Sequence, residues 1–297
     1  MSERLDTVDG RQTLHIERRL AHPPEKVWSA VTQPEHLSRW FPAEVRLEPR
    51  PGGRIVFSLG GGTDPATESV GLVTAYEPPR LFAFTWDDDL FRIEVRPEDT
   101  GCLLVFRHTF DDRPAAASYA SGWRTCLDEL ERIVDGRPAG PEHRPSALLH
   151  ESYVEAFGLA DGTVEATPDG WRVRFARQLT QPAETVWATL LGPDPGRPAT
   201  VGDVPPAGFT TEAFPAGGIT ALDAPRLLEY AWPATGRPLG RIRWELTAGT
   251  GHGARLVLVQ TGPAEAVADR TAALTVWRAR IEPLAHRLAE LAERPAD

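Results

Sequence analysis

Residue clusters with the spacing that metal, phosphate or nucleophile chemistry requires do not occur in this sequence. The glycine-rich segment 60–69 lacks the GK[ST] ending of a phosphate-binding loop, and the acidic run 87–89 lacks the spaced ligands of a calcium loop. No histidine–cysteine pair has zinc-ligand spacing, and neither GxSxG nor an ordered Ser/His/Asp set is present. We therefore expect no metal and no cofactor, and we assign no catalytic residue.

His108 is the main candidate for chemistry, because an imidazole changes its charge near neutral pH. It lies in the apolar stretch GCLLVFRHTF, residues 101–110. Alternation puts Cys102, Leu104, Phe106 and His108 on one face, and Leu103, Val105 and Arg107 on the other. Both faces carry apolar residues, so alternation alone does not identify the inward one. Two interpretations stay open: His108 contacts a ligand or transfers a proton, or it pairs with a carbonyl at the edge of the core.

The segments that would position His108 belong to an internal sequence repeat. VTAYEPPRLFAFTW at 73–86 is repeated as ITALDAPRLLEYAW at 219–232, LAHPPEKVW at 20–28 as LTQPAETVW at 179–187, and GWRTCLDEL at 122–130 as VWRARIEPL at 276–284. Three repeats in the same order predict two tandem domains. Their tryptophans recur in both copies, which favours a role in packing for Trp28, Trp86 and Trp123.

The spacing of the repeats indicates how the copies differ. Trp28 and Trp187 are 159 residues apart, whereas Trp86 and Trp232 are 146 apart, so the second copy lacks 13 residues between its first helix and its middle strands. We expect one domain at 1–137 and a second at 169–297. The linker, 138–168, is rich in proline and glycine and contains a short predicted helix at 145–158.

Local patterns predict the same α+β order in each copy. In the first, strands are expected at 13–20, 43–49, 54–59, 68–77, 81–86, 90–96 and 102–109, short helices at 23–33 and 34–41, and a long helix at 114–136. The predicted buried face of the long helix consists of Tyr119, Trp123, Cys126, Leu130 and Ile133. The last helix of the second copy carries an apolar stripe from Val267 to Leu291, and Pro283 should kink it.

The sequence motifs of the first copy resemble those of the SRPBCC superfamily, whose members have the START-like or helix-grip fold and include Bet v 1-like proteins. Within it, the chain is most similar to the branch of the activator of heat-shock protein 90 ATPase. The resemblance rests on PPEKVWSAVTQPEHLSRWF, RPGGRIVF, GLVTAYEPPRLFAFTW, GCLLVFRHTF and GWRTCLDEL. It implies a curved antiparallel sheet wrapped around a long C-terminal helix in each domain. The second copy lacks counterparts of RPGGR and HLSRWF, so we interpret it as degenerate.

The resemblance also implies a ligand cavity between the sheet and the long helix of the N-terminal domain. It places the face of His108 inward and aligns His108 with Gln260 of the second copy. Trp40 and Phe41 lie where this fold has its entrance; they could gate a ligand or hold the short helix on the sheet. The candidate ligand-binding residues are Trp40, Phe41, Phe57, Trp86, Phe91, Ile93, Leu104, Phe106, His108, Tyr119 and Trp123.

Three functions fit this reading. The leading hypothesis is non-catalytic binding of a small, largely apolar molecule in the N-terminal domain, because the fold implies a cavity and the sequence offers no catalytic set. The first alternative is an enzyme that resembles the tandem aromatase/cyclases of polyketide pathways, with His108 as its proton-transfer group. The second is a co-chaperone that activates a chaperone ATPase. On balance the sequence favours a protein that is not an enzyme.

Charge, hydropathy and residue preferences limit the binding partners and the cellular location that we expect for the protein. The net charge of −10 disfavours binding to the phosphate backbone of a nucleic acid. No apolar run approaches the roughly 20 residues of a membrane span, and the N-terminus lacks the core of a signal peptide, so we expect a cytoplasmic protein without membrane contact. The preference for arginine over lysine, with abundant Ala, Gly and Pro, suggests a GC-rich bacterium. The sequence leaves a homodimer open.

Overall fold

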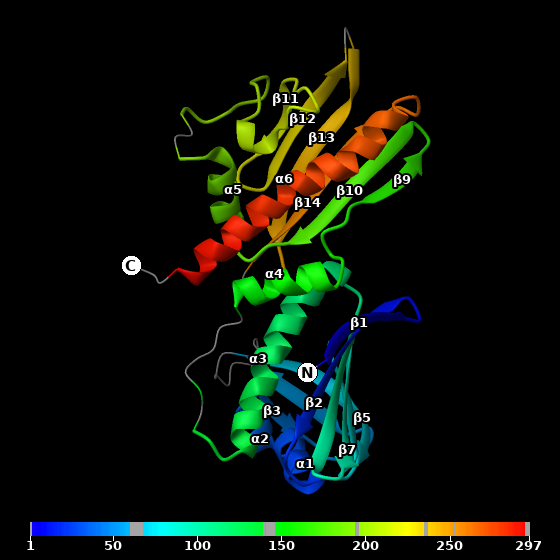
Figure 1. Cartoon of the computed structure of the whole chain (residues 1–297), viewed down its shortest axis with the longest axis vertical. Coiled ribbons are helices and arrows are strands. Elements are labelled where there is room, and N and C mark those ends of the chain that lie inside the picture. Colours follow the sequence, from blue (N-terminus) through cyan, green and yellow to red (C-terminus); the bar gives the residue numbers. More distant parts are fainter. Residues whose placement is uncertain are drawn as a thin grey trace. The chain divides into compact units, whose positions relative to one another are not determined.

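The chain forms two compact units, residues 1–145 and 146–297, which are described separately (Figure 1). The computed structural model describes residues 2–59, 68–138, 140, 146–193, 196–234, 237–251 and 253–294. Each unit combines one antiparallel sheet with a long helix at its C-terminal end. This arrangement confirms the predicted α+β fold with two tandem helix-grip domains.

The first unit has an eight-stranded sheet in the order β1-β2-β8-β7-β6-β5-β4-β3. Its strands are β1 (Ser2–Val8), β2 (Arg11–Leu20), β3 (Glu44–Leu47), β4 (Arg54–Ser58), β5 (Glu68–Glu77), β6 (Leu81–Trp86), β7 (Asp89–Glu98) and β8 (Gly101–Phe110). Its helices are α1 (Pro24–Thr32), α2 (Pro34–Leu37), the 3-10 turn η2 (Arg113–Ala115) and α3 (Ala116–Val134). The predicted strands of this unit are all present, with ends within about two residues.

Strand β1 was not predicted. It pairs along its whole length with β2, at the edge of the sheet. An edge strand buries little, so the segment is polar and shows no apolar alternation that would reveal it. Its pairing explains why Thr13 and His15, which alternate with the core residues Leu14 and Ile16 along β2, are buried as well.

The buried face of α3 differs from the predicted stripe. Trp123 and Leu130 are buried as expected, but Tyr119, Cys126 and Ile133 are only half-buried. The buried positions are Ala116, Ala117, Ala120, Ser121, Trp123, Leu127, Leu130 and Val134. Small side chains in the first turns let the helix backbone approach the sheet closely, so the larger neighbours lie at the margin of the contact.

The second unit has a six-stranded sheet in the order β11-β12-β13-β14-β10-β9. Its strands are β9 (Thr163–Thr167), β10 (Gly170–Gln178), β11 (Ile219–Asp223), β12 (Leu227–Ala234), β13 (Arg237–Ala248) and β14 (Ala254–Gly262). Its helices are α4 (Ala147–Ala156), α5 (Ala183–Leu191), the 3-10 turn η3 (Ala207–Phe209) and α6 (Val267–Glu293). Edge strand β9, like β1, was not predicted. Among the residues described between α5 and β11, η3 and an isolated bridge stand in place of the β3–β4 hairpin.

The repeated segments 73–86 and 219–232 form the same turn in both sheets. In the first, the Arg80 amide donates to the Glu77 carbonyl (2.7 Å) and the Arg80 carbonyl accepts from the Val95 amide (2.9 Å). In the second, Arg226 makes the equivalent bonds with Asp223 (2.6 Å) and Leu246 (2.8 Å). The repetition is therefore architectural.

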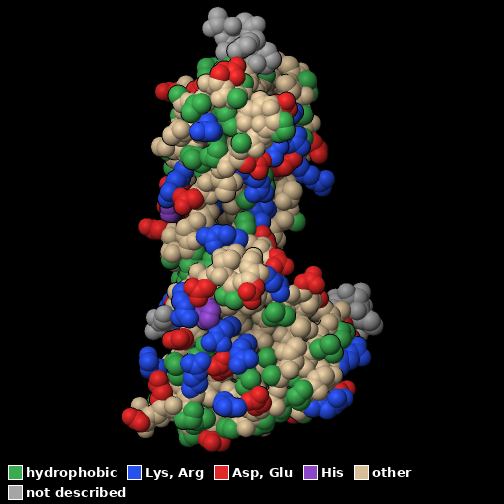
Figure 2. All heavy atoms as spheres, turned by 90° about the vertical axis from the view of Figure 1, so that its right-hand side faces the viewer, with side chains coloured by type: hydrophobic (Ala, Val, Ile, Leu, Met, Phe, Trp, Pro, Cys, Tyr) green, Lys and Arg blue, Asp and Glu red, His purple; other side chains and the backbone are tan. Residues whose placement is uncertain are grey.

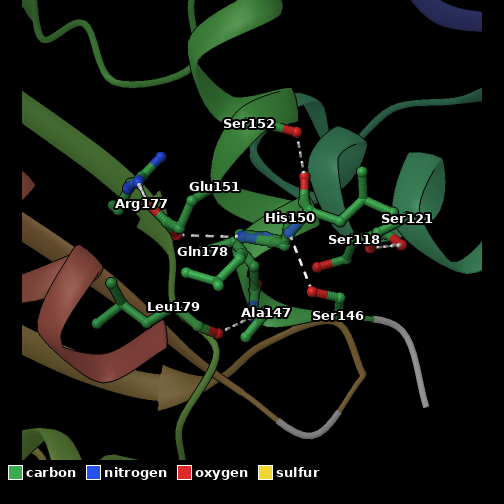
Figure 3. Close-up of polar contacts among 12 residues, drawn as sticks. Ser118, Ser121, Ser146, Ala147, His150, Glu151, Ser152, Arg177, Gln178 and Leu179 are labelled. Carbon is green, nitrogen blue, oxygen red and sulfur yellow. Dashed lines mark hydrogen bonds and ion pairs between the residues drawn. The ribbon is translucent and has the colours of Figure 1, made fainter. Parts of the chain in front are cut away.

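Helix α4 belongs to the second unit and is held at two places. Its N-cap is Ser146, and the Glu293 carboxylate at the end of α6 accepts hydrogen bonds from the Ser146 hydroxyl (2.8 Å) and the Ala147 amide (2.6 Å). Glu151 of α4 forms an ion pair with Arg177 of β10, both buried, and lies 3.2 Å from Nδ1 of His150 (Figure 3). Carboxylates thus connect α4 to both layers of its unit.

Helix α6 covers the second sheet with a stripe that matches the prediction in its central part. Trp277, Ile281, Leu284 and Leu288 are buried, whereas Val267, at the first turn, is half exposed. The helix continues through Pro283.

Among the described residues, no helix is both long and apolar enough to cross a membrane.

Candidate functional site

The interior of the first unit is filled by aromatic side chains that touch one another. We call the following residues the aromatic cluster: Trp40, Phe41, Phe57, Phe84, Trp86, Phe91, Phe106, His108, Tyr119 and Trp123. All predicted site residues lie in it or, for Ile93 and Leu104, are buried in the same core. Phe84 is a member that the sequence analysis missed, although it alternates with Trp86 on β6.

Phe41 is the central ring of the cluster. Its ring centroid lies 5.2–6.4 Å from those of six others: Trp40, Phe57, Phe84, Trp86, Phe91 and Trp123. Apart from neighbouring Trp40, these rings come from β4, β6, β7 and α3, whereas Phe41 comes from the turns that follow α2. The predicted second helix ends at Leu37, not at Phe41, because the chain must turn there to reach β3.

Few side-chain bonds attach the segment 38–43 to its surroundings. The Trp40 indole donates to the Ala30 carbonyl (3.0 Å), and the Ser38 hydroxyl accepts from the Val45 amide (2.9 Å). Trp40 and Phe41 are 3% and 5% exposed, so both point inward. Backbone bonds tie the segment to α2, among them one from the Phe41 amide to the Leu37 carbonyl (2.9 Å), while the Phe41 ring itself is held by contacts with other rings.

His108 has a partner at each ring nitrogen. Nδ1 lies 3.1 Å from the Trp123 Nε1, and Nε2 lies 2.7 Å from Oδ2 of Asp89. An indole N–H can only donate, so Nδ1 must accept, and the proton of the neutral ring sits on Nε2, where it is donated to Asp89. The imidazole also stacks on Phe91, with 4.4 Å between centroids and 12° between planes.

Burial sets the charge of His108. The side chain is 1% exposed, and this desolvation lowers its pKa below the usual 6.5, although the hydrogen bond to Asp89 acts in the opposite direction. The ring is therefore neutral at neutral pH. Its partners are a carboxylate and an indole, where the sequence analysis considered a carbonyl.

Asp89 was missed by the sequence analysis, which considered the acidic run 87–89 only as a calcium-binding loop. It pairs with Trp86 across the β6–β7 hairpin, and alternation puts it on the same face of β7 as Phe91 and Ile93. This alternation could have revealed from the sequence that Asp89 lies on the inner face of β7.

Trp86 and Tyr119 form the partly exposed edge of the cluster. The Trp86 indole donates to the Ser69 hydroxyl (2.7 Å), and its ring stacks on Phe57 with 4.5 Å between centroids. Tyr119 lies edge-on to His108, at 4.5 Å. These two rings are the predicted site residues that solvent reaches most readily.

The second unit carries a counterpart of the pair between the indole and His108. Trp277 of α6 donates its indole N–H to Oε1 of Gln260 (2.5 Å), and Gln260 pairs with Ile242 as His108 pairs with Phe91. Gln260 is thus the structural equivalent of His108.

A cavity of about 740 Å³ lies at the surface of the second unit, between the start of α5, the β11–β12 turn and the β13–β14 hairpin. Leu227 and Leu246 contribute apolar lining, and Glu184, Asp223, Arg226 and Glu245 contribute charge. It is lined by no residue of the aromatic cluster.

Charged residues on the outer face of the first sheet are paired with one another. Burial raises the pKa of Glu94, but hydrogen bonds from Arg92, Arg96 and Arg107 outweigh it and lower the value to about 2. Figure 2 shows basic and acidic side chains interspersed on the face of this unit that it displays, at the bottom of the view.

Within the described part of the chain, no group of three or more His, Cys, Asp or Glu residues is placed to hold a metal.

Residues 21–135 match the family described as Activator of Hsp90 ATPase homolog 1-like protein. The match runs from the residues before α1 to the end of α3, so the first unit contains a domain of this type. No curated protein matches the sequence.

Solved structures similar to the chain cover about half of it. The conserved protein of unknown function EF2215 from Enterococcus faecalis is 20% identical and covers 52% of this chain and 90% of its own, with a TM-score of 0.43. CalU16 from Micromonospora echinospora is 26% identical and covers 53% of this chain and 94% of its own, with a TM-score of 0.41. The AHSA1-like protein from Aeromonas hydrophila is 22% identical and covers 44% and 99%, with a TM-score of 0.37.

Proposed function

We propose that the first unit binds a small, largely apolar molecule inside the aromatic cluster, in the space that the Phe41 ring fills in this structure. The observation that carries the proposal is the origin of that ring. Its neighbours come from four regular elements, whereas Phe41 itself comes from a turn segment with few side-chain bonds.

Movement of the segment 38–43 would leave a site walled by Phe57, Trp86, Phe91 and Trp123. A planar apolar molecule could replace the lost contacts, because each favourable ring–ring pair contributes about 0.5–1.5 kcal/mol beyond burial of its area. The partly exposed ring of Trp86 lies at the edge of this space. The site thus suits an aromatic or polycyclic ligand with few polar groups.

The geometry of His108 favours binding over catalysis. A general acid or base needs a nitrogen within reach of the reacting molecule, and both nitrogens of His108 are engaged by Asp89 and Trp123. In this arrangement His108 holds the Trp123 and Phe91 rings in place. The cyclase alternative would require His108 to exchange one of these partners for its substrate.

Native mass spectrometry of the full chain purified from its own host tests whether a molecule is carried, and denaturation releases it for identification. Titration with 1-naphthol, followed by the Trp indole resonances, tests the site directly. We expect binding by the wild-type chain, and binding at least ten-fold tighter by Phe41→Ala, in which the competing ring is absent.

Phe82→Ala is the matched control. Phe82 is also buried, on the same face of β6 as Phe84 and Trp86, but its ring contacts Tyr76 and Phe84, not Phe41. It should bind 1-naphthol no more tightly than the wild type. A wild-type protein that carries nothing and shows no perturbation at Trp86 or Trp123 would refute the proposal.

A further inference from the structure

Among the buried N–H donors that lack an acceptor in the described part of the second unit, two lie in its aromatic core. Oε1 of Gln260 accepts from the Trp277 indole, but its Nε2 has no hydrogen-bond partner among the described residues, and neither has Nε1 of Trp171. Gln260 is 0% exposed and Trp171 is 2% exposed. Buried donors are almost always paired, so two in one core require an explanation.

The two donors lie on the same face of adjacent strands. Trp171 of β10 pairs with Gly262 of β14, and the next inward pair is Val173 with Gln260. The Trp171 indole occupies the space above Gly262, since a Cβ there would be 2.4 Å from its Cζ2. Trp171 and Gln260 are therefore diagonal neighbours on the inner surface of the sheet.

The first unit shows which acceptor the second one lacks. Asp89, which accepts from His108, pairs with Trp86; its equivalent, paired with Trp232, is Gly240. A side chain cannot be restored at that position, because a Cβ on Gly240 would lie 1.9 Å from the Thr261 carbonyl oxygen. The backbone of the second unit thus excludes a carboxylate at the position equivalent to Asp89.

The surroundings restrict what can serve as the acceptor. Trp232 lies next to Trp171, with 5.9 Å between ring centroids, and Phe214 and Trp244 lie next to Trp277, at 6.0 Å and 5.8 Å. These walls supply no cation, so a carboxylate or phosphate here would be buried without a counter-charge. A neutral oxygen meets both requirements: it accepts hydrogen bonds and tolerates an aromatic environment.

We propose that the second unit has a buried site for a neutral acceptor oxygen, bound by Nε2 of Gln260 and Nε1 of Trp171. The oxygen is that of an ordered water molecule or of the carbonyl group of a small molecule. This site is independent of the function proposed for the first unit. It gives the degenerate copy a binding role of its own.

A crystal structure of the full wild-type chain at a resolution that shows ordered water tests the proposal. We expect electron density for one non-protein atom within 3.2 Å of both nitrogens. An isolated peak identifies water, whereas extended density, with a matching mass released on denaturation, identifies a small molecule. Absence of such density at either nitrogen, or a protein acceptor for either, would overturn the proposal.

Gln260→Met removes the amide donors while keeping a side chain of similar length. Its crystal structure should show the density lost or moved to Trp171 alone. Because the wild-type structure decides the question by itself, the proposal stays testable if this variant does not fold.

Discussion

Each unit has an aromatic residue in the segment between its first helices and its middle strands, but the two residues are held differently. Phe41 follows α2 in the first unit, and its segment is held by ring contacts and by local backbone bonds to α2, such as that from the Phe41 amide to the Leu37 carbonyl (2.9 Å). Phe209 ends η3 in the second, and its carbonyl accepts hydrogen bonds from Tyr230 (2.8 Å) and Trp244 (3.1 Å). Arg280 of α6 adds a bond to the preceding carbonyl, that of Gly208 (2.7 Å).

This difference indicates how one fold can serve two purposes. A ring on a weakly attached segment can leave the core and admit a ligand, whereas a ring held through its own backbone carbonyl is a fixed part of the core. The first unit has the β3–β4 hairpin that supplies Phe57, whereas the residues described between α5 and β11 of the second unit form no such hairpin. In the second unit, hydrogen bonds to the Phe209 and Gly208 carbonyls hold this region.

The largest effect expected from this comparison is that of Phe209→Ala. It should lower the free energy of unfolding of the second unit by about 3–5 kcal/mol, because the bound carbonyls stop the segment from closing the cavity. Phe41→Ala should cost the first unit clearly less, since its segment can relax. Denaturant titrations followed by hydrogen-exchange mass spectrometry report the units separately. Equal losses would show that the two rings are held alike.

The wild-type protein offers a test without mutation. Amides of residues 38–43 should exchange at least ten-fold faster than those of residues 207–210, which corresponds to an opening free energy lower by about 1.4 kcal/mol. The measurement is native-state hydrogen exchange at one pH and temperature. Slower exchange at 38–43 would contradict the mobility that ligand entry requires.

Tyr230→Phe should have a smaller effect. It removes the hydroxyl that donates to Phe209 and leaves the ring, so we expect a loss of about 1 kcal/mol in the second unit. The Phe209 segment should also exchange faster. Tyr76→Phe, at a half-buried tyrosine in the first unit, is the control and should change stability less.

The smallest expected effect is a pH dependence confined to the first unit. The pKa of His108 is lowered by burial, so the unfolded chain binds its proton more readily than the folded one. Stability from this group is complete above about pH 6.5 and is lost as the pH falls below it. His108→Gln, which imitates Gln260, should reduce this slope. An unchanged slope would assign it to other groups, such as His15, whose pKa is also lowered by burial.

The sequence predicted what repeats locally and missed what depends on long-range pairing. Alternation identified the inner strands, and the recurring tryptophans identified the helix–sheet contact. Strands β1 and β9 were missed because edge strands need no apolar face. Asp89 was missed because its role depends on His108, which reaches it through the pairing of β7 with β8.

The candidate site was predicted in composition but not in arrangement. The same reasoning that put Phe41 at an entrance could not show that its ring fills the centre of the cluster, since that depends on how the chain turns after Leu37. The hydrogen bonds to the Phe209 carbonyl were equally invisible, because they join residues 21 and 35 positions apart.

The bonds that Glu293 makes with α4 have a consequence for synthesis. The ribosome completes α4, with its Ser146 N-cap, early in the second unit, but the carboxylate that accepts from the Ser146 hydroxyl and the Ala147 amide is added only with the last turn of α6. During translation α4 thus lacks this second acceptor, whereas the first unit can fold as soon as it emerges. The contact between α4 and the end of α6 forms only after α6 has been synthesised.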